Sequence, residues 1–387
     1  MMYKLVLLSD PDCGWPDEVA ALVSSTMKTI LQRDDLLDVQ KSVPDENDPT
    51  LAPVVVVYLG SELAAENQLI VAELQKAEQQ AFSILPIVRS EDIISEVMPD
   101  NLRRLNAITW DSMKAEVAMR ILEMFGIIEK KRRLFLSYKR DETNLLALQL
   151  CRALSERRFD VFLDRFSVPP GDDFPRRIDI ELADKSFVLL LESRSALDSP
   201  WVQHEVSYAL AHHISVLALT MPDVPSGSLF GVIDEAFRYR LRQENFQGRS
   251  GELNENALNV ILDEIELRCA RQLRRRRTQL LGSLSDWLFQ AGFRFHAVDD
   301  WAILADKEGE GQSVLMVTPR GPTPADLREV DLLRNRIPSA NPDKIRGYVV
   351  HSTPNQDPDN QALVEWILSG RPLATKGLDE LPILWGL

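Results

Sequence analysis

Residues 187–219 read FVLLLESRSALDSPWVQHEVSYALAHHISVLAL, and this stretch decides the fold that we predict. It opens with a continuous apolar run over 187–191, which is typical of a strand buried on both faces. A polar loop and a helical segment over 201–212 follow, and a second apolar run covers 214–219. A strand, a helix and a strand in this order indicate a βαβ unit, so we expect a doubly wound parallel sheet.

The residues before this stretch continue the same alternation of elements. Residues 134–138 (LFLSY) predict a short buried strand that ends in a polar turn, and residues 143–157 carry apolar groups at helical spacing. Residues 159–164 (FDVFLD) predict the next strand, and the Pro-Pro-Gly turn at 169–171 opens the next helix. We therefore predict that residues 129–245 form one α/β domain.

The N-terminal segment repeats this order. LVLLS at 5–9 corresponds to LFLS at 134–137, and the apolar run at 54–59 corresponds to the strand at 187–191. Glu73 corresponds to Glu205, and the two matching segments end in Ser-Ile-Leu at 83–85 and Ser-Val-Leu at 215–217. We interpret residues 1–128 as a tandem copy of the same domain. The alternative is that any two α/β domains look alike at this level of detail.

The last part of the chain predicts a different architecture. Residues 246–278 are interpreted as a linker and a long helix, and residues 279–387 as a separate α+β domain that begins with a helix and a β-meander. The order of elements resembles the restriction-endonuclease-like core. The strand at 314–318 (VLMVT) lacks the Glu and Lys that such a nuclease needs, so we expect at most an inactive binding module.

Composition limits the compartment and the partners. The net charge is −15, and an acidic surface repels nucleic acid. Two basic clusters differ from this trend, at 130–133 (KKRR) and 274–277 (RRRR). We interpret the first as a linker and the second as a helix end, where cations suit the helix dipole, with a phosphate or nucleic-acid role as the alternative. We expect a cytoplasmic protein, because no apolar run approaches the roughly 20 residues of a membrane span.

Two residues of the opening stretch have chemistry suited to a nucleotide. Trp201 and Glu205 are four residues apart on a predicted helix, so they share one face. This helix begins where a buried strand ends, which is the edge where open parallel sheets bind ligands. An aromatic ring can stack on a base, and a carboxylate can stabilise an oxocarbenium-like transition state. Spacing alone does not favour a catalytic role, because a Trp and a Glu four residues apart are more often a core residue and a solvated neighbour.

Three segments resemble the conserved boxes of TIR domains. Residues 133–141 (RLFLSYKRD) resemble the first box, and residues 162–164 (FLD) with 168–171 (VPPG) resemble the second box and its loop. Residues 201–205 (WVQHE) resemble the Trp-x-x-x-Glu segment of NAD-hydrolysing TIR domains. The resemblance implies flavodoxin-like parallel sheets, in tandem if the N-terminal copy is counted. It also implies cleavage of the nicotinamide–ribose bond of NAD⁺, assembly into a homo-oligomer through TIR–TIR contacts, and a role in anti-phage or innate-immune defence.

Site residues follow from the resemblance one by one. It implies that Glu205 is the catalytic glutamate. It implies that Gly171 and Phe174 belong to the loop that gates the substrate pocket. The residues expected to contact the NAD⁺ substrate are Ser137, Tyr138, Arg140 and Trp201.

The remaining expectations concern cofactors, partners and the alternative function. NAD⁺ is expected as a substrate and not as a cofactor, because neither GxGxxG nor GxxxxGK occurs. We expect no metal, because His204 and His212 have no third ligand at motif spacing. The N-terminal copy has Leu69 in place of Trp201, so we expect it to be an inactive assembly or sensing domain. A trigger ligand or protein is expected at the C-terminal domain. The alternative function is a non-enzymatic TIR scaffold.

Overall fold

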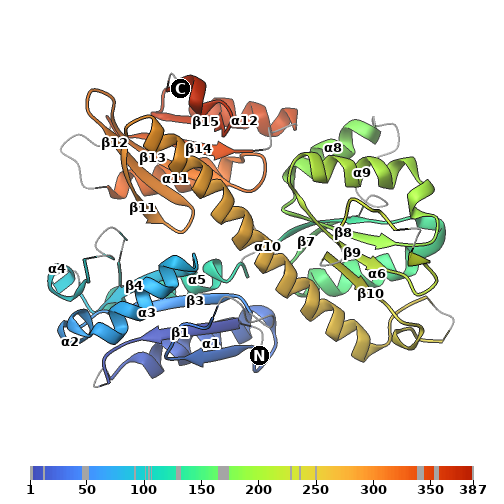
Figure 1. Cartoon of the computed structure of the whole chain (residues 1–387), viewed down its shortest axis with the longest axis horizontal. Coiled ribbons are helices and arrows are strands. Elements are labelled where there is room, and N and C mark those ends of the chain that lie inside the picture. The colour runs from blue at the N-terminus through green and yellow to red at the C-terminus, as the bar shows by residue number, and fades with distance from the viewer. Residues whose placement is uncertain are drawn as a thin grey trace. The chain divides into compact units, whose positions relative to one another are not determined.

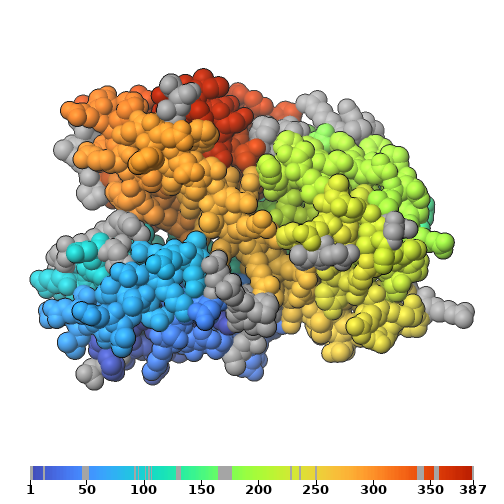
Figure 2. All heavy atoms as spheres, viewed as in Figure 1, coloured from blue at the N-terminus to red at the C-terminus, as the bar shows by residue number. Residues whose placement is uncertain are grey.

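The structure of the protein is a computed structural model of the whole chain, shown in Figures 1 and 2. The chain divides into two compact units, residues 1–128 with 288–315 and residues 129–287 with 316–387. The described residues are 3–11, 14–45, 52–90, 93–100, 102, 105, 107–127, 132–163, 174–226, 229–234, 237–248, 251–337, 344–352 and 357–385, without the side chains of 95 and 174–176.

The middle of the chain forms a five-stranded sheet in the order β7-β6-β8-β9-β10, and all of its neighbouring strands are parallel. This confirms the doubly wound α/β fold expected from the apolar runs. The strands are β6 (Arg133–Ser137), β7 (Asp160–Phe162), β8 (Phe187–Glu192), β9 (Ser215–Thr220) and β10 (Arg238–Arg240). The helices between them are α6 (Arg140–Glu156), α8 (Phe174–Asp184) and α9 (Pro200–Ala211).

Helices cover both faces of this sheet. Leu134 and Leu136 of β6 pack with α6 on one face, whereas Phe135 packs with α8 and α9 on the other. This alternation follows from the strand geometry, which turns successive side chains to opposite faces. Figure 1 shows α8 and α9 on one side of the sheet and α6 on the other. A strand buried on both faces needs an apolar residue at nearly every position, which is why β8 reads FVLLLE.

The N-terminal sheet has the same strand order. It runs β2-β1-β3-β4-β5 with parallel pairing, so the first strand lies between the second and the third in both sheets. Glu73 and Glu205 each occupy the sixth position of a 12-residue helix. The shared topology supports a tandem duplication, which stays a proposal. The strands are β1 (Tyr3–Leu8), β2 (Leu37–Gln40), β3 (Val54–Leu59), β4 (Ser83–Val88) and β5 (Ile108–Thr109). The helices are α1 (Pro16–Leu31), α2 (Glu62–Glu66), α3 (Gln68–Gln79), α4 (Ile94–Val97) and α5 (Trp110–Met124).

A single long helix, α10 (Glu255–Gln290), replaces the two helices expected on either side of residue 278. The expected break is wrong because the arginines at 274–277, interpreted above as a helix end, lie inside the helix instead. The helix ends just before Gly292, whose φ of 77° is the left-handed conformation that glycine adopts most easily. None of the described helices, α10 included, is both long and apolar enough to cross a bilayer.

The C-terminal sheet has the strand order β11-β12-β13-β14-β15, with an antiparallel first pair and a parallel last pair. Sequence analysis missed β15 and α13, because both are short and carry little apolar periodicity. The likeness to a nuclease core and the domain boundaries stay predictions. The strands are β11 (Arg294–Asp299), β12 (Ala302–Lys307), β13 (Gly311–Thr318), β14 (Arg346–His351) and β15 (Leu373–Gly377). The helices are α11 (Pro324–Arg336), α12 (Pro358–Leu368) and α13 (Leu381–Leu384).

The packing of α10 on the sheet predicts that two cysteines differ in their reactivity toward alkylating reagents. Cys269 of α10 lies in the core, where burial raises the pKa of its thiol to about 12, whereas Cys151 of α6 is only half-buried. The thiolate is the reactive form of cysteine, so we expect iodoacetamide at pH 8 to label Cys151 in the native protein and to leave Cys269 unlabelled until urea unfolds the chain. Peptide mass mapping measures this, and equal labelling of both thiols in the native state would contradict the packing.

Candidate functional site

The candidate site lies at the edge of the central sheet where the strands end. β6 ends at Ser137 and β8 ends at Glu192, and α9 begins a few residues after β8. Pro200 occupies the first turn of α9, and the Ser199 side chain accepts a hydrogen bond from the backbone N–H of Val202 at 3.5 Å. Proline at the first turn and serine at the N-cap fix the start of this helix. The start of α9 is therefore held at the edge where open parallel sheets bind their ligands.

Glu205 is the buried carboxylate of this edge. Its side chain comes from α9, and the residue is only 5% exposed. The Oγ–H of Ser137, which is fully buried at the end of β6, donates a hydrogen bond to Glu205 Oε2 at 2.5 Å. A buried carboxylate is costly unless such donors satisfy it, and bonds to an ionised group are short and strong. The structure thus brings together two predicted site residues that are 68 positions apart.

Trp201 lies one helical turn before Glu205 and is 47% exposed. A large aromatic side chain that is half in water at a sheet edge exposes part of its ring to solvent, and a planar group can stack on an exposed ring. Arg140 is exposed at the first residue of α6, at the same edge of the sheet. Both residues therefore lie on the side of the domain where the resemblance places the substrate.

The Tyr138 ring lies on the other face of the sheet from α9, and its expected contact with the substrate stays a prediction. Its ring belongs to the core on the face covered by α6 and α10, whereas α9 and Glu205 belong to the other face. Side chains along an extended chain point alternately to the two faces of a sheet. Tyr138 therefore lies on the same face as Leu134 and Leu136, whereas Ser137 lies on the same face as Phe135. The structure does not bring the Tyr138 ring to Glu205, so a contact with the substrate finds no support in this placement.

The expected gating loop lies outside the described residues. Gly171 and the second-box segments at 164 and 168–171 are not described, and Phe174 is described only as the first residue of α8, without its side chain. The roles expected for Gly171 and Phe174 stay predictions.

A polar cluster that sequence analysis missed joins two loops of this edge. Lys139 Nζ donates to Ser195 Oγ at 2.6 Å, and Ser195 Oγ–H donates to Glu142 Oε1 at 2.5 Å. Burial opposes ionisation of Glu142, but hydrogen bonds from serine groups, Ser195 among them, and the charge of Lys139 lower the pKa of its carboxyl. The cluster fixes the loop after β6 against the loop after β8. Polar residues that follow two adjacent buried strands are the signal that could have revealed it.

A second buried carboxylate, Glu192, has a structural role. It accepts hydrogen bonds from Thr220 Oγ1 at 2.7 Å, from the Phe230 N–H at 3.0 Å and from Arg238 Nε at 3.2 Å. A carboxylate with this many donors has few lone pairs left for a substrate. Glu192 therefore ties β10 and the loop before it to the end of β8.

A cavity of about 360 Å³ opens where β8 and β9 end. Polar groups from three loops meet there, and Glu205 is not among the residues that line it. The principal lining residues are Glu142, Ser193, Arg194, Met221, Asp223 and Phe246.

The histidines of α9 do not assemble a metal site. His204 Nε2 lies 2.6 Å from Asp179 Oδ1 of α8, so this ring is used in a contact between two helices. Within the described residues no three histidine, cysteine or acidic side chains are grouped so as to hold a metal ion.

The N-terminal sheet domain holds the glutamate at the matching position differently. Glu73 Oε2 accepts a hydrogen bond from the backbone N–H of Val43 at 2.5 Å, so it is bound by the segment after β2 and not by a serine at the end of the first strand. Leu69, in the place of Trp201, is 78% exposed. The two sheets therefore share a topology, but they differ in what surrounds the corresponding glutamate.

The parallel sheet and its strand order are flavodoxin-like, and the family comparison identifies the domain. Residues 134–247 match the family model described as TIR domain, so this part of the chain is one. No curated protein matches the chain.

Proposed function

We propose that the TIR domain is an NAD⁺ glycohydrolase in which Glu205 is the catalytic carboxylate. The observation that supports this most is the burial of Glu205 at the ligand-binding edge, with its Oε2 held by the Ser137 hydroxyl. A hydroxyl donor favours the ionised form of a carboxyl group over the neutral form and fixes its orientation. In the proposed reaction positive charge develops on a sugar, and a negative charge that is already oriented toward the sugar stabilises it.

The proposed reaction breaks the bond between the nicotinamide nitrogen and C1′ of the ribose. The electron pair of this bond leaves with the ring, which departs as neutral nicotinamide, and positive charge develops on the ribose. Glu205 stabilises that oxocarbenium-like charge. Water then adds to C1′ and releases a proton, which gives ADP-ribose, or an internal nucleophile of the ADP-ribose adds and gives a cyclic product. Ser137 acts as a positioning residue through Glu205.

Trp201 supplies the surface that stacks on a ring of the substrate. Replacing it with Ala is expected to raise KM and to lower kcat/KM by the equivalent of about 1–3 kcal/mol, the usual contribution of stacking between a base and an aromatic ring. Trp201→Phe keeps a ring and should retain most of the affinity. Steady-state kinetics with NAD⁺ measures both variants. Leu69→Ala, at the matching place in the N-terminal copy, is the control and should change neither constant; a KM for Trp201→Ala equal to that of the wild type would contradict the stacking.

Assembly is the second part of the proposal. TIR domains associate with one another, and we propose that contacts between copies of this chain complete the substrate site. The rate of nicotinamide release per protein molecule is then expected to rise with protein concentration. Initial rates measured alongside the molecular mass by light scattering test this, and a rate per molecule that is constant while the mass rises would contradict it.

A non-enzymatic scaffold is the alternative function. The bond between Ser137 and Glu205 is also what a purely structural carboxylate makes, and the half-exposed Trp201 suits a contact between protein surfaces. The scaffold predicts that concentrated wild-type protein associates and leaves NAD⁺ intact.

A further inference from the structure

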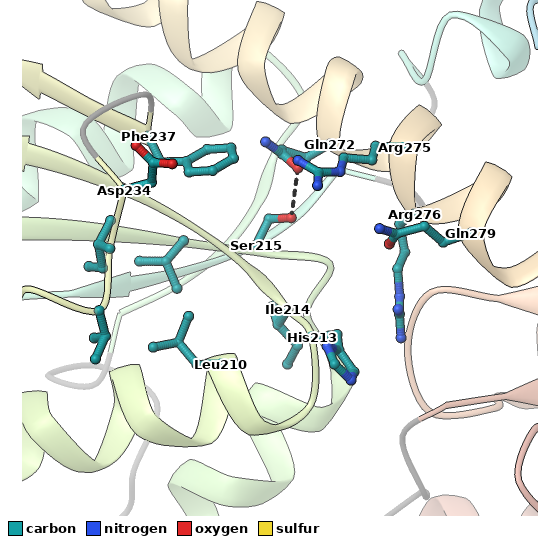
Figure 3. A pocket seen from close by; sticks show the side chains of 13 residues that line it. Leu210, His213, Ile214, Ser215, Asp234, Phe237, Gln272, Arg275, Arg276 and Gln279 are labelled. Carbon is teal, nitrogen blue, oxygen red and sulfur yellow. Dashed lines mark hydrogen bonds between the residues drawn. The ribbon is translucent and has the colours of Figure 1, made fainter.

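A second cavity, of about 260 Å³, lies on the other side of the TIR domain. The end of α9, the first residues of β9 and one face of α10 form its walls, as Figure 3 shows. Ser215, where β9 begins, lines it, whereas Glu205 lies at the edge where the strands end. The two sites are therefore separate, and a ligand in this cavity is independent of the proposed glycohydrolase activity.

One face of α10 gives this cavity its charge. Gln272, Arg275, Arg276 and Gln279 line it, and their spacing of three, one and three residues places them on neighbouring turns of one helical face. The arginine cluster at 274–277 therefore contributes positive charge to a cavity, a role that is not expected of a helix end. Two of its four guanidinium groups face the cavity. In a chain with a net charge of −15 this is a local positive site.

The guanidinium of Arg276 is only partly satisfied. One of its terminal nitrogens donates to the Ser352 hydroxyl, while its buried Nε has no hydrogen-bond partner among the described residues. Burial lowers the pKa of this group. A guanidinium stays protonated in proteins, and a partly buried charge with few polar partners is unfavourable. An anion in the cavity would supply the missing partner.

The opposite side of the cavity differs in character. In Figure 3 Phe237 and Asp234 lie together on the side away from Arg276 and His213. The ring of Phe237 offers a surface for an aromatic base, and the Asp234 carboxylate can accept hydrogen bonds from hydroxyl or amino groups. Leucine, isoleucine and valine side chains form the apolar part of the lining: Leu210, Ile214, Val216, Val232 and Ile233.

We propose that this cavity binds a nucleoside phosphate no larger than a mononucleotide. The phosphate pairs with Arg275 and Arg276, and the base lies against Phe237. Arginine suits this role because its planar fork of donors matches phosphate oxygens. The cavity volume of about 260 Å³ lies below the range of about 300–1,000 Å³ that is usual for drug-sized ligands, which limits the ligand to this size.

Calorimetric titration of the full-length protein with AMP tests the proposal. The titration uses a Trp201→Ala background, which removes the proposed stacking surface of the other site. AMP is expected to bind more tightly than inorganic phosphate or adenosine, because only AMP satisfies both sides of the cavity. Arg276→Gln should weaken AMP binding about tenfold or more, since a hydrogen bond to a charged group contributes about 1.5–3 kcal/mol. Arg275→Gln, at an exposed position that the fold tolerates, should weaken it as well.

Arg274→Gln is the matched control, because it removes the same charge from a neighbouring residue that does not line the cavity. It should leave AMP binding within about twofold, as expected for a charge outside the site. The proposal is overturned if AMP does not bind, if both Arg275→Gln and Arg276→Gln bind AMP as tightly as their background does, or if inorganic phosphate binds as tightly as AMP.

Discussion

Replacing Glu266 with Gln is expected to lower the free energy of unfolding by about 3–5 kcal/mol, as is usual when one partner of a buried ion pair is removed. Glu266 lies on α10 and is almost fully buried. Its Oε1 accepts a bond from Arg132 Nη1 at 2.5 Å, and its Oε2 accepts one from Arg157 Nη1 at 3.2 Å. Arg132 directly precedes β6 and Arg157 directly follows α6, and both arginines are themselves buried. Glutamine has no charge, so the buried Arg132 would lose its ion pair with Glu266, whereas Arg157 would keep its second ion pair, with Asp263 Oδ1 at 2.6 Å.

Urea unfolding followed by tryptophan fluorescence measures this loss. Glu264→Gln is the matched control, because Glu264 lies two residues away on the same helix and pairs with Arg268 at a partly exposed position. Helix pairs of that kind contribute about 0.3–0.5 kcal/mol, so the control should hardly move the unfolding midpoint. Equal stability of the two variants would show that the buried triad does not hold α10 on the sheet.

Glu205→Gln is expected to reduce nicotinamide release about a thousandfold or more, in line with the loss of a principal electrostatic group from an active site. The substitution keeps the size of the side chain and an oxygen that can accept the Ser137 hydroxyl bond, so the fold should survive. It removes only the negative charge that would stabilise the developing cation. Circular dichroism together with the unfolding midpoint checks that the variant stays folded.

The chain provides its own control for this substitution. Glu73→Gln changes the corresponding glutamate of the N-terminal copy, at the same position of an equally long helix. Because Glu73 is bound by the Val43 backbone and has Leu69 beside it in place of a tryptophan, we expect its loss to leave the rate unchanged. Wild-type turnover in Glu205→Gln would contradict the role of Glu205.

The fold was predictable because burial on both faces leaves a clear pattern in the sequence. β8 and β9 are continuous apolar runs, and the helices between strands begin at recognisable turns. Pattern alone is misleading for α10, where four consecutive arginines suggest a helix end. A helix interior accepts arginine readily, so charge alone does not mark an end.

The site was predictable only in part. The spacing of Trp201 and Glu205 is local, and the resemblance to TIR domains identified both. The bond between Ser137 and Glu205 joins a strand to a helix 68 positions later, and no local pattern encodes it. The placement of Tyr138 shows the opposite case: it directly follows β6 and continues the alternation of Leu134 and Leu136, so its face could have been predicted by counting along the sequence.

Product analysis of NAD⁺ incubated with the wild-type chain tests the central claim most directly. The full-length protein, at a concentration where light scattering shows association, is incubated with NAD⁺, and the products are separated and weighed by mass spectrometry. The proposed glycohydrolase predicts one nicotinamide for each NAD⁺ consumed, together with an equal amount of linear or cyclic ADP-ribose. Intact NAD⁺ in the presence of folded, associated protein would contradict the claim and leave the chain a TIR scaffold.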